Sequence, residues 1–153
     1  MQRRSFLKGM SAVAAIGVIP AVSFADSAPK SGNELSYDAA LKVVTGGKAP
    51  QKSDKIKLKA PEIAENGAVV PISVDVDSPM SEGDYVKSIH IFATKNANSR
   101  CVDIHLTPAN GQAMLSTRIK LGGTQEVVGL AELSNGEFIM ASQSVKVTIG
   151  GCG

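Results

Sequence analysis

Apolar and polar residues alternate along most of the chain after residue 55. In the clearest segment, residues 70–76, valine or isoleucine occupies every second position, and Ser73 and Asp75 lie between them. Residues that alternate in this way point to opposite faces of a β-strand, so one face is buried and the other meets solvent. The pattern recurs in segments 56–58, 89–93, 102–106, 115–121, 126–133 and 145–149. About seven strands at this spacing predict an all-β, immunoglobulin-like β-sandwich.

A short helix is predicted before the first strand. Ser36 is a suitable N-cap, and Tyr37, Leu41 and Val44 follow at the i, i+4 and i+7 spacing of one helical face. The glycines at positions 46 and 47 predict its end. Two turn signals separate strands further along, Glu65-Asn66-Gly67 before segment 70–76 and Asn135-Gly136 at the last hairpin.

Some strands are apolar on both faces, and two interpretations of their second face stay open. Either the predicted helix or a loop covers it, or it is a hydrophobic patch that binds a protein partner. The residues of this second face are Phe92, Val128, Leu130, Phe138 and Met140. Cys101 alternates out of phase with the apolar residues of segment 102–106. We therefore expect its thiol on the outer face of that strand, accessible or at the partner interface.

The first 25 residues resemble an export signal. Arg3 and Arg4 precede a Ser-Phe-Leu-Lys sequence and an apolar run over residues 10–22, the pattern of a twin-arginine signal. The small residues before Asp26 predict cleavage there. A run of 13 residues is shorter than the ~20 that cross a bilayer. We therefore expect a periplasmic protein with no membrane segment in its mature form.

Four regions follow from these patterns. They are a signal peptide at 1–25, a leader with the short helix and a linker at 26–54, a β-sandwich domain at 55–149 and a tail at 150–153. Loss of Arg3, Arg4 and Lys8 with the signal leaves 13 basic and 14 acidic residues. Without a basic block, the mature chain is not expected to bind nucleic acid.

Candidate metal ligands are few. His90 and His105 are the only histidines, and Cys101 lies four residues before the second, a spacing that faintly resembles a blue-copper loop. Four residues along one strand span about 13 Å, too far to share an ion. We expect both histidines to be polar residues of a surface or interface, and no metal or cofactor. No nucleophile elbow, CxxC, phosphate loop or HExxH occurs, although composition alone leaves a Ser-His-Asp site open.

The tail places Cys152 between Gly150, Gly151 and Gly153. A disulfide with Cys101 is one interpretation, because it would close a long loop in an exported protein. A glycine-rich terminus is, however, a poor anchor for a structural staple. Four extended residues reach about 13 Å, which suits a thiol that enters the site of another protein. No Lys, Arg or His flanks the cysteine to activate it, so activating groups are expected from visiting enzymes.

These features together resemble the SoxY family, the sulfur-carrier subunits of the bacterial thiosulfate-oxidising Sox system. The matching stretches are the twin-arginine signal, KAPEIAENGAVVP at 59–71, STRIKLG at 116–122 and VKVTIGGCG at 145–153. The family tail is usually Gly-Gly-Cys-Gly-Gly, so this chain ends one glycine earlier. Cys101 is a second departure, since such carriers typically have the tail cysteine alone.

The resemblance implies a carrier and not a catalyst. It implies an immunoglobulin-like sandwich that pairs with SoxZ, which is exported together with it. SoxAX, a haem enzyme, would join thiosulfate to the cysteine, and SoxB, a manganese enzyme, would release sulfate. Where present, a sulfane dehydrogenase would oxidise the remaining sulfur. Cys152 would be the attachment site, with Gly150, Gly151 and Gly153 as its flexible mount.

Two other functions stay open on the sequence. A ubiquitin-like sulfur carrier also ends in glycines, but it needs ATP-dependent activation, which an exported protein lacks. The second is a structural or ligand-binding exported β-sandwich whose tail cysteine is incidental or disulfide-bonded.

Overall fold

The structure, a computed structural model, describes residues 34–151. The expected signal peptide, the mature start at Asp26, and Cys152 and Gly153 lie outside this range. In chain order the elements are α1 (Tyr37–Thr45), β1 (Gln51–Lys52), β2 (Ile56–Lys59), β3 (Ile63–Asn66), β4 (Val70–Val76), β5 (Val86–Ala93), β6 (Arg100–His105), the 3-10 helix η1 (Pro108–Asn110), β7 (Ala113–Ile119), β8 (Gln125–Leu133) and β9 (Phe138–Ile149). None of the helices between residues 34 and 151 has the length and apolarity to cross a membrane.

Helix α1 begins and ends where the sequence predicts. The side-chain oxygen of Ser36 accepts a hydrogen bond from the Ala39 amide at 3.4 Å, as an N-cap does. Gly46 has a φ of 63°, a left-handed conformation that glycine adopts without strain. One face of the helix is buried and the other solvated, since Ala40 is 0% and Val43 is 64% exposed.

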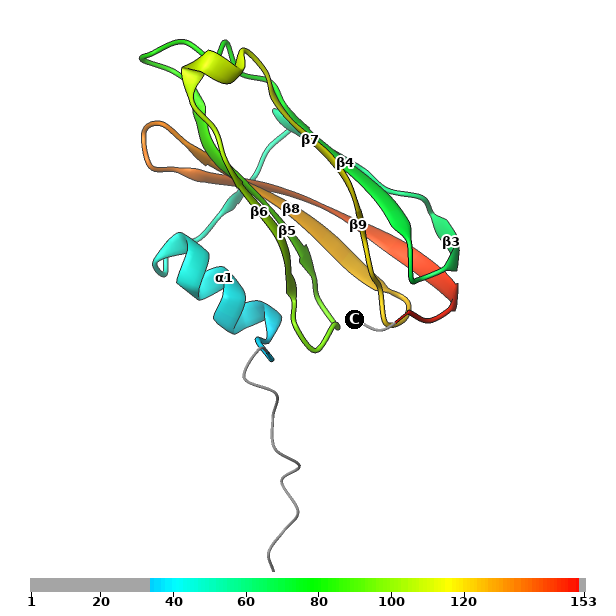
Figure 1. Cartoon of the computed structure of the whole chain (residues 1–153). Helices are drawn as coiled ribbons and strands as arrows, with labels where there is room; N and C mark the ends of the chain where they lie inside the picture. The colour runs from blue at the N-terminus through cyan, green and yellow to red at the C-terminus, as the bar shows by residue number, and fades with distance from the viewer. Residues whose placement is uncertain (1–33, 152–153) are drawn as a thin grey trace, which may run out of the picture.

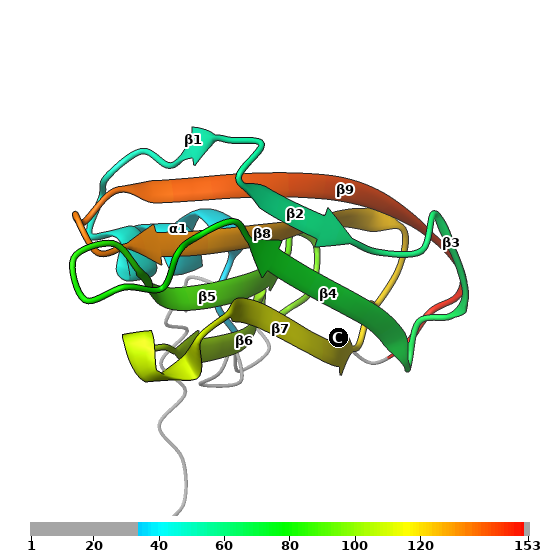
Figure 2. The ribbon, with the colours of Figure 1, turned by 90° about the horizontal axis from the view of Figure 1, so that it is seen from above.

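The strands form two sheets that face each other, and α1 lies on the outer side of the larger one (Figure 1). The larger sheet has the order β1-β9-β8-β5-β6, with β3 also paired to β9, and the smaller has the order β2-β4-β7. β1 and β3 pair with β9 in parallel, whereas the other described pairs are antiparallel. Seen from above, α1 and the smaller sheet lie on opposite sides of the larger sheet (Figure 2).

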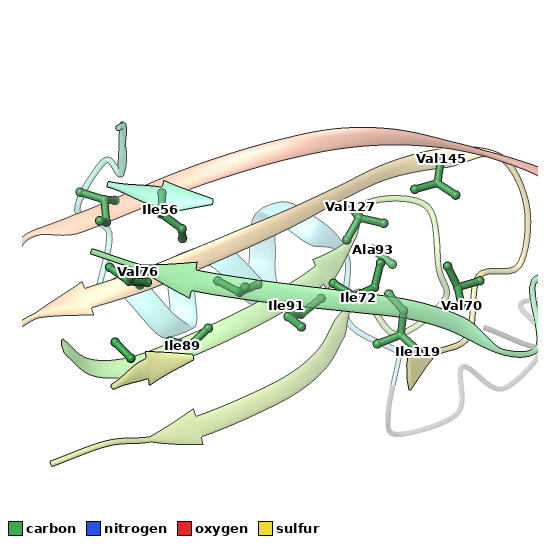
Figure 3. Packing of buried hydrophobic residues seen from close by; sticks show 14 of the residues in the cluster. Ile56, Val70, Ile72, Val76, Ile89, Ile91, Ala93, Ile119, Val127 and Val145 are labelled. Atoms are coloured by element: carbon green, nitrogen blue, oxygen red, sulfur yellow. The ribbon is translucent and has the colours of Figure 1, made fainter. Parts of the chain in front are cut away.

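The main core fills the space between the two sheets (Figure 3). The alternating apolar residues of β4, from Val70 to Val76, are 0–3% exposed. Ile89 and Ile91 project from β5 toward the same core and are fully buried. Burying a side chain of this size stabilises the fold by roughly 1.5–3 kcal/mol. The alternation read from the sequence therefore identifies the core face of these strands.

The sequence missed two of the nine strands found between residues 34 and 151. β1 consists of two exposed polar residues, and β3 is exposed at three of its four positions. Neither shows the apolar alternation that marks a strand in sequence, and both are strands because their backbones pair with β9. Segments 138–141 and 145–149, which the pattern separates, are one 12-residue strand.

Candidate functional site

The tail cysteine follows two residues that the structure describes, Gly150 and Gly151, which we call the tail root. Beyond the end of β9, the tail root lies beside the loop between β7 and β8, at the lower right of Figure 1. The Gly67 amide donates to the Ile149 carbonyl at 2.7 Å, and the Leu121 amide donates to the Gly67 carbonyl at 2.7 Å. The Gly151 amide donates to the Leu121 carbonyl at 2.9 Å. The tail root is therefore held between two loops.

Close backbone contacts explain why the tail root is glycine. A Cβ on Gly150 would lie 2.5 Å from the Gly122 carbonyl oxygen, and one on Gly151 would lie 2.6 Å from the Ala68 nitrogen. Neither distance is sterically acceptable. The sequence led us to expect both glycines to serve mobility as part of a free arm. In the structure both glycines make close backbone contacts instead, and the rest of the expected arm, Cys152 and Gly153, lies outside the described residues.

The tail root contributes geometry and no reactive group of its own. Its closest neighbours are backbone atoms of four residues, Gly67, Ala68, Leu121 and Gly122, which we call the cradle. A backbone cradle offers no side-chain acid, base or nucleophile. It can hold and aim a residue attached to it.

The second cysteine, Cys101, lies in a different environment from the one predicted. Ile91 pairs with Val102 and Phe92 pairs with Arg100, so Cys101 is the extra residue of a β-bulge. The bulge turns its thiol inward, where it is half-buried against the main core and donates to the Ser99 carbonyl at 3.6 Å. The expected outer-face position is therefore wrong, because the alternation was extrapolated across a bulge.

The environment of Cys101 also suppresses its reactivity. Burial raises the pKa of the thiol to about 11, and hydrogen bonds with the Ala93 backbone and the Asn96 side chain oppose only part of that rise. The thiolate is the nucleophilic form of cysteine. Cys101 is thus poorly suited to carry a substrate at neutral pH.

Helix α1 covers the second apolar face of the large sheet. The buried residues of this smaller core are Ala40, Phe92, Val128, Leu130 and Phe138, with Met140 half-buried at its edge. The Tyr37 ring packs edge-on against the Phe92 ring at 5.8 Å. Of the two interpretations left open by the sequence, the covering helix is correct for Phe92, Val128, Leu130 and Phe138. These four residues of the large sheet are not an exposed patch in this chain.

A row of polar side chains continues along the same face of β5, β6 and β8. His90 contacts Asp103 through Nδ1 at 2.5 Å and Ser88 through Nε2 at 2.9 Å. Arg100 donates to the other oxygen of Asp103 at 2.7 Å. Burial tends to raise the pKa of Asp103, but the hydrogen bonds from His90 and Arg100 outweigh it and lower the pKa. The expectation of a surface or interface His90 is wrong, since it is only 4% exposed.

This row has the order of a Ser-His-Asp triad but lacks the exposure of one. Ser88 lies within a strand, is 1% exposed, and its hydroxyl is also 3.4 Å from Glu132. A substrate carbonyl cannot reach a hydroxyl so enclosed, and a catalytic serine requires such access. His105, by contrast, is exposed, with its ring 6.5 Å from that of His90. In the part of the chain that the structure describes, no cluster of three or more His, Cys, Asp or Glu could hold a metal ion.

Comparison with known proteins places the chain in a family. The family profile described as "SoxY: Sulfur oxidation protein SoxY" matches residues 41–152. The structure of the sulfur carrier protein SoxY from Chlorobium limicola f thiosulfatophilum is 33% identical, with a TM-score of 0.62 over 73% of this chain and 96% of that chain. The superoxide reductase (neelaredoxin) from Ignicoccus hospitalis has a TM-score of 0.55 at 14% identity, covering 61% of this chain and 80% of that one, which is a likeness of fold alone. No curated protein sequence matches the chain.

The match and the geometry cover the same part of the molecule. The profile begins inside α1 and ends at Cys152, so it spans both sheets, the cradle and the tail root. The β-sandwich predicted from the alternation is confirmed. The chain belongs to the SoxY family of sulfur oxidation proteins.

Proposed function

We propose that this chain is a covalent carrier of sulfur compounds in thiosulfate oxidation, with the Cys152 thiol as the attachment site. The observation that carries the proposal is the family match, which includes Cys152 and is accompanied by a sulfur carrier of known structure at 33% identity. The backbone cradle supports it, because it supplies a mount and no catalytic group. On this proposal the chain is not an enzyme and needs no cofactor.

Two reactions on the thiol define the carrier cycle. In the first, SoxAX removes two electrons and joins the Cys152 sulfur to the outer sulfur of thiosulfate, so that R–SH and S2O3²⁻ give R–S–S–SO3⁻, one proton and two electrons for its haem. In the second, SoxB hydrolyses this adduct with water to R–S–SH, sulfate and one proton. A sulfane dehydrogenase then oxidises the remaining sulfur where the host has one. The haem and manganese belong to these partner enzymes.

We propose that a SoxZ subunit is the stable partner of this chain. Four residues of the candidate docking patch are removed by burial beneath α1: Phe92, Val128, Leu130 and Phe138. Met140 at the edge of the covered face and the half-buried Cys101 stay candidates for residues near the interface. Co-expression with a tagged SoxZ followed by affinity purification tests the pairing. Recovery of the tagged SoxZ alone would contradict it.

Export to the periplasm by the twin-arginine route completes the proposal. Replacing Arg3 and Arg4 with lysine keeps the charge but removes the paired guanidinium groups that define the signal. The variant should accumulate in the cytoplasm at its full precursor length. Periplasmic recovery of the variant at the normal level would exclude this route.

Mass spectrometry tests the central claim. Purified chain with SoxZ, SoxAX and thiosulfate should gain the mass of S2O3, which is thiosulfuric acid less two hydrogens, and the adduct should map to Cys152. Cys152→Ser should fold, bind SoxZ and gain nothing, whereas the matched variant Cys101→Ser should load as the parent does. Loading of Cys152→Ser would refute the assignment. A mass two hydrogens below the reduced chain, lost in either variant, would instead favour the disulfide.

A further inference from the structure

The cradle and the end of the chain around the tail root form a closed ring of backbone hydrogen bonds between three segments distant in sequence. Its three hydrogen bonds link Gly67 with Ile149, Leu121 with Gly67, and Gly151 with Leu121. The tail root therefore does not simply follow β9 into solvent. The Ile149 carbonyl before Gly150 and the Gly151 amide after it are tied to two different loops.

Gly67 is the residue on which this ring depends. A Cβ at this position would lie 2.2 Å from the Leu121 carbonyl oxygen and 2.8 Å from the Gly151 nitrogen. Both atoms belong to backbone, which cannot rotate away as a side chain can. The φ of Gly67 is outside the left-handed region, so glycine is required here for space. Any other residue must displace Leu121 or the tail root and so break the ring.

The opposite wall of the cradle is braced from inside the protein. The Asn96 side chain, 8% exposed, donates to the Lys120 carbonyl at 2.8 Å and accepts from the Gly122 amide at 3.0 Å. The Gln125 side chain donates to the same Asn96 oxygen at 2.9 Å. Two buried amides thus fix the loop that receives the Gly151 hydrogen bond. Side-chain hydrogen bonds therefore hold this wall in place.

We propose that Gly67 is a positioning residue for the carrier thiol, because its cradle fixes the tail root so that only the chain beyond Gly151 serves as the arm. The inference rests on the proposed carrier function of Cys152. Neighbouring Cα atoms are about 3.8 Å apart, so a fixed Gly151 fixes the attachment point of the next residue to within that distance. Released from the cradle, the tether would start at Ile149 and hold three residues instead of one.

The length of the tether sets the size of the effect. Effective concentration at a docked enzyme falls with about the −3/2 power of tether length, so a change from one residue to three lowers it about fivefold. The intrinsic chemistry of the thiol stays the same, because the cradle consists of neutral backbone. Gly67→Ala should therefore lower kcat/KM for loading by SoxAX at least about fivefold, and should leave iodoacetamide alkylation of Cys152 unchanged in a Cys101→Ser background.

Hydrogen exchange of the Gly151 amide tests the cradle without any partner enzyme. In the parent chain this amide should exchange about tenfold more slowly than in a tail peptide, as one ordinary hydrogen bond implies. Gly67→Ala should abolish the difference. Gly123→Ala is the matched control, because Gly123 lies in the loop between β7 and β8 and a Cβ there would meet nothing within 4 Å. This variant should behave as the parent in both assays.

A second variant covers the case in which Gly67→Ala fails to fold. Gly151→Ala places a Cβ 2.6 Å from the Ala68 nitrogen outside both hydrophobic cores, and should show the same loss of loading. Peptide-like exchange of Gly151 in the parent would overturn the cradle. Normal loading of the Gly151→Ala variant would overturn the positioning role of the cradle. Loading of Cys152→Ser would remove Cys152 as the attachment site, while the exchange result would still stand.

Discussion

The thiol of Cys101 should react much more slowly than an ordinary cysteine. Burial raises its pKa to about 11, against ~8.5 for an unperturbed thiol. At a pH of about 8 the thiolate fraction falls from about a quarter to about one in a thousand, a factor of roughly 200. A thiolate of higher pKa is intrinsically more nucleophilic, and this raises the rate again by about tenfold. The net prediction is alkylation about 20-fold slower, before any steric shielding.

Single-cysteine variants isolate the two thiols. Cys152→Ser leaves only Cys101, and Cys101→Ser leaves only Cys152. Each is treated with iodoacetamide at a series of pH values from about 7 to 11, and intact mass gives the rate. The logarithm of the Cys101 rate should rise linearly with pH across nearly the whole range. After unfolding in urea, Cys101 should react at the rate of an ordinary thiol, which shows that the folded environment is the cause.

The shape of the pH profile decides the outcome. If the rate for Cys101 in the folded protein levels off near a pH of about 8.5, its thiol is not buried as the bulge places it. Equal rates for Cys101 before and after unfolding would refute the reasoning in the same way. Either result would also restore Cys101 as a candidate carrier thiol.

Two further perturbations test the covered face of the large sheet. Phe92→Ala removes a fully buried ring beneath α1 and should lower the free energy of unfolding by about 3–5 kcal/mol in urea titrations. The control Val43→Ala, on the exposed side of the helix, should change it by less than about 0.5 kcal/mol. Equal effects of the two substitutions would mean that α1 does not pack on this face. Because the pKa of Asp103 is lowered in the folded state, its stabilising contribution is present above the ordinary carboxyl pKa and is lost as pH falls through the folded value. Asp103→Asn should therefore be less stable than the parent near neutral pH and converge with it in acid, and a constant difference at every pH would contradict the ion-pair origin.

Hydrophobic periodicity predicted the parts of the fold that the core determines. Segment 70–76 was identified to the residue, because one face of β4 packs on the core and the other meets solvent. β1 and β3 were missed, since pairing with β9 makes them strands and leaves their side chains mostly exposed. Backbone pairing of this kind leaves no periodic trace in the sequence.

The same limit applies to the candidate site. The sequence indicated Cys152 through its unusual place among glycines, and that interpretation needed no tertiary information. It could not show that Gly67, more than 80 residues earlier, receives the tail root. The turn signal at residues 65–67 explained that glycine by local geometry alone. It is the contact with Leu121 and Gly151 that makes a Cβ unacceptable there.

The surroundings of Cys101 and of the tail root differ in what they do to a thiol. Burial at the β-bulge holds Cys101 in its protonated form. The cradle contacts the tail root through neutral backbone groups. In the proposed cycle the thiol accepts thiosulfate once and its cargo is then released in later steps, so a thiolate strongly stabilised by the protein would hinder the later steps as much as it helped the first. A mount that fixes position and leaves reactivity to each visiting enzyme avoids this conflict.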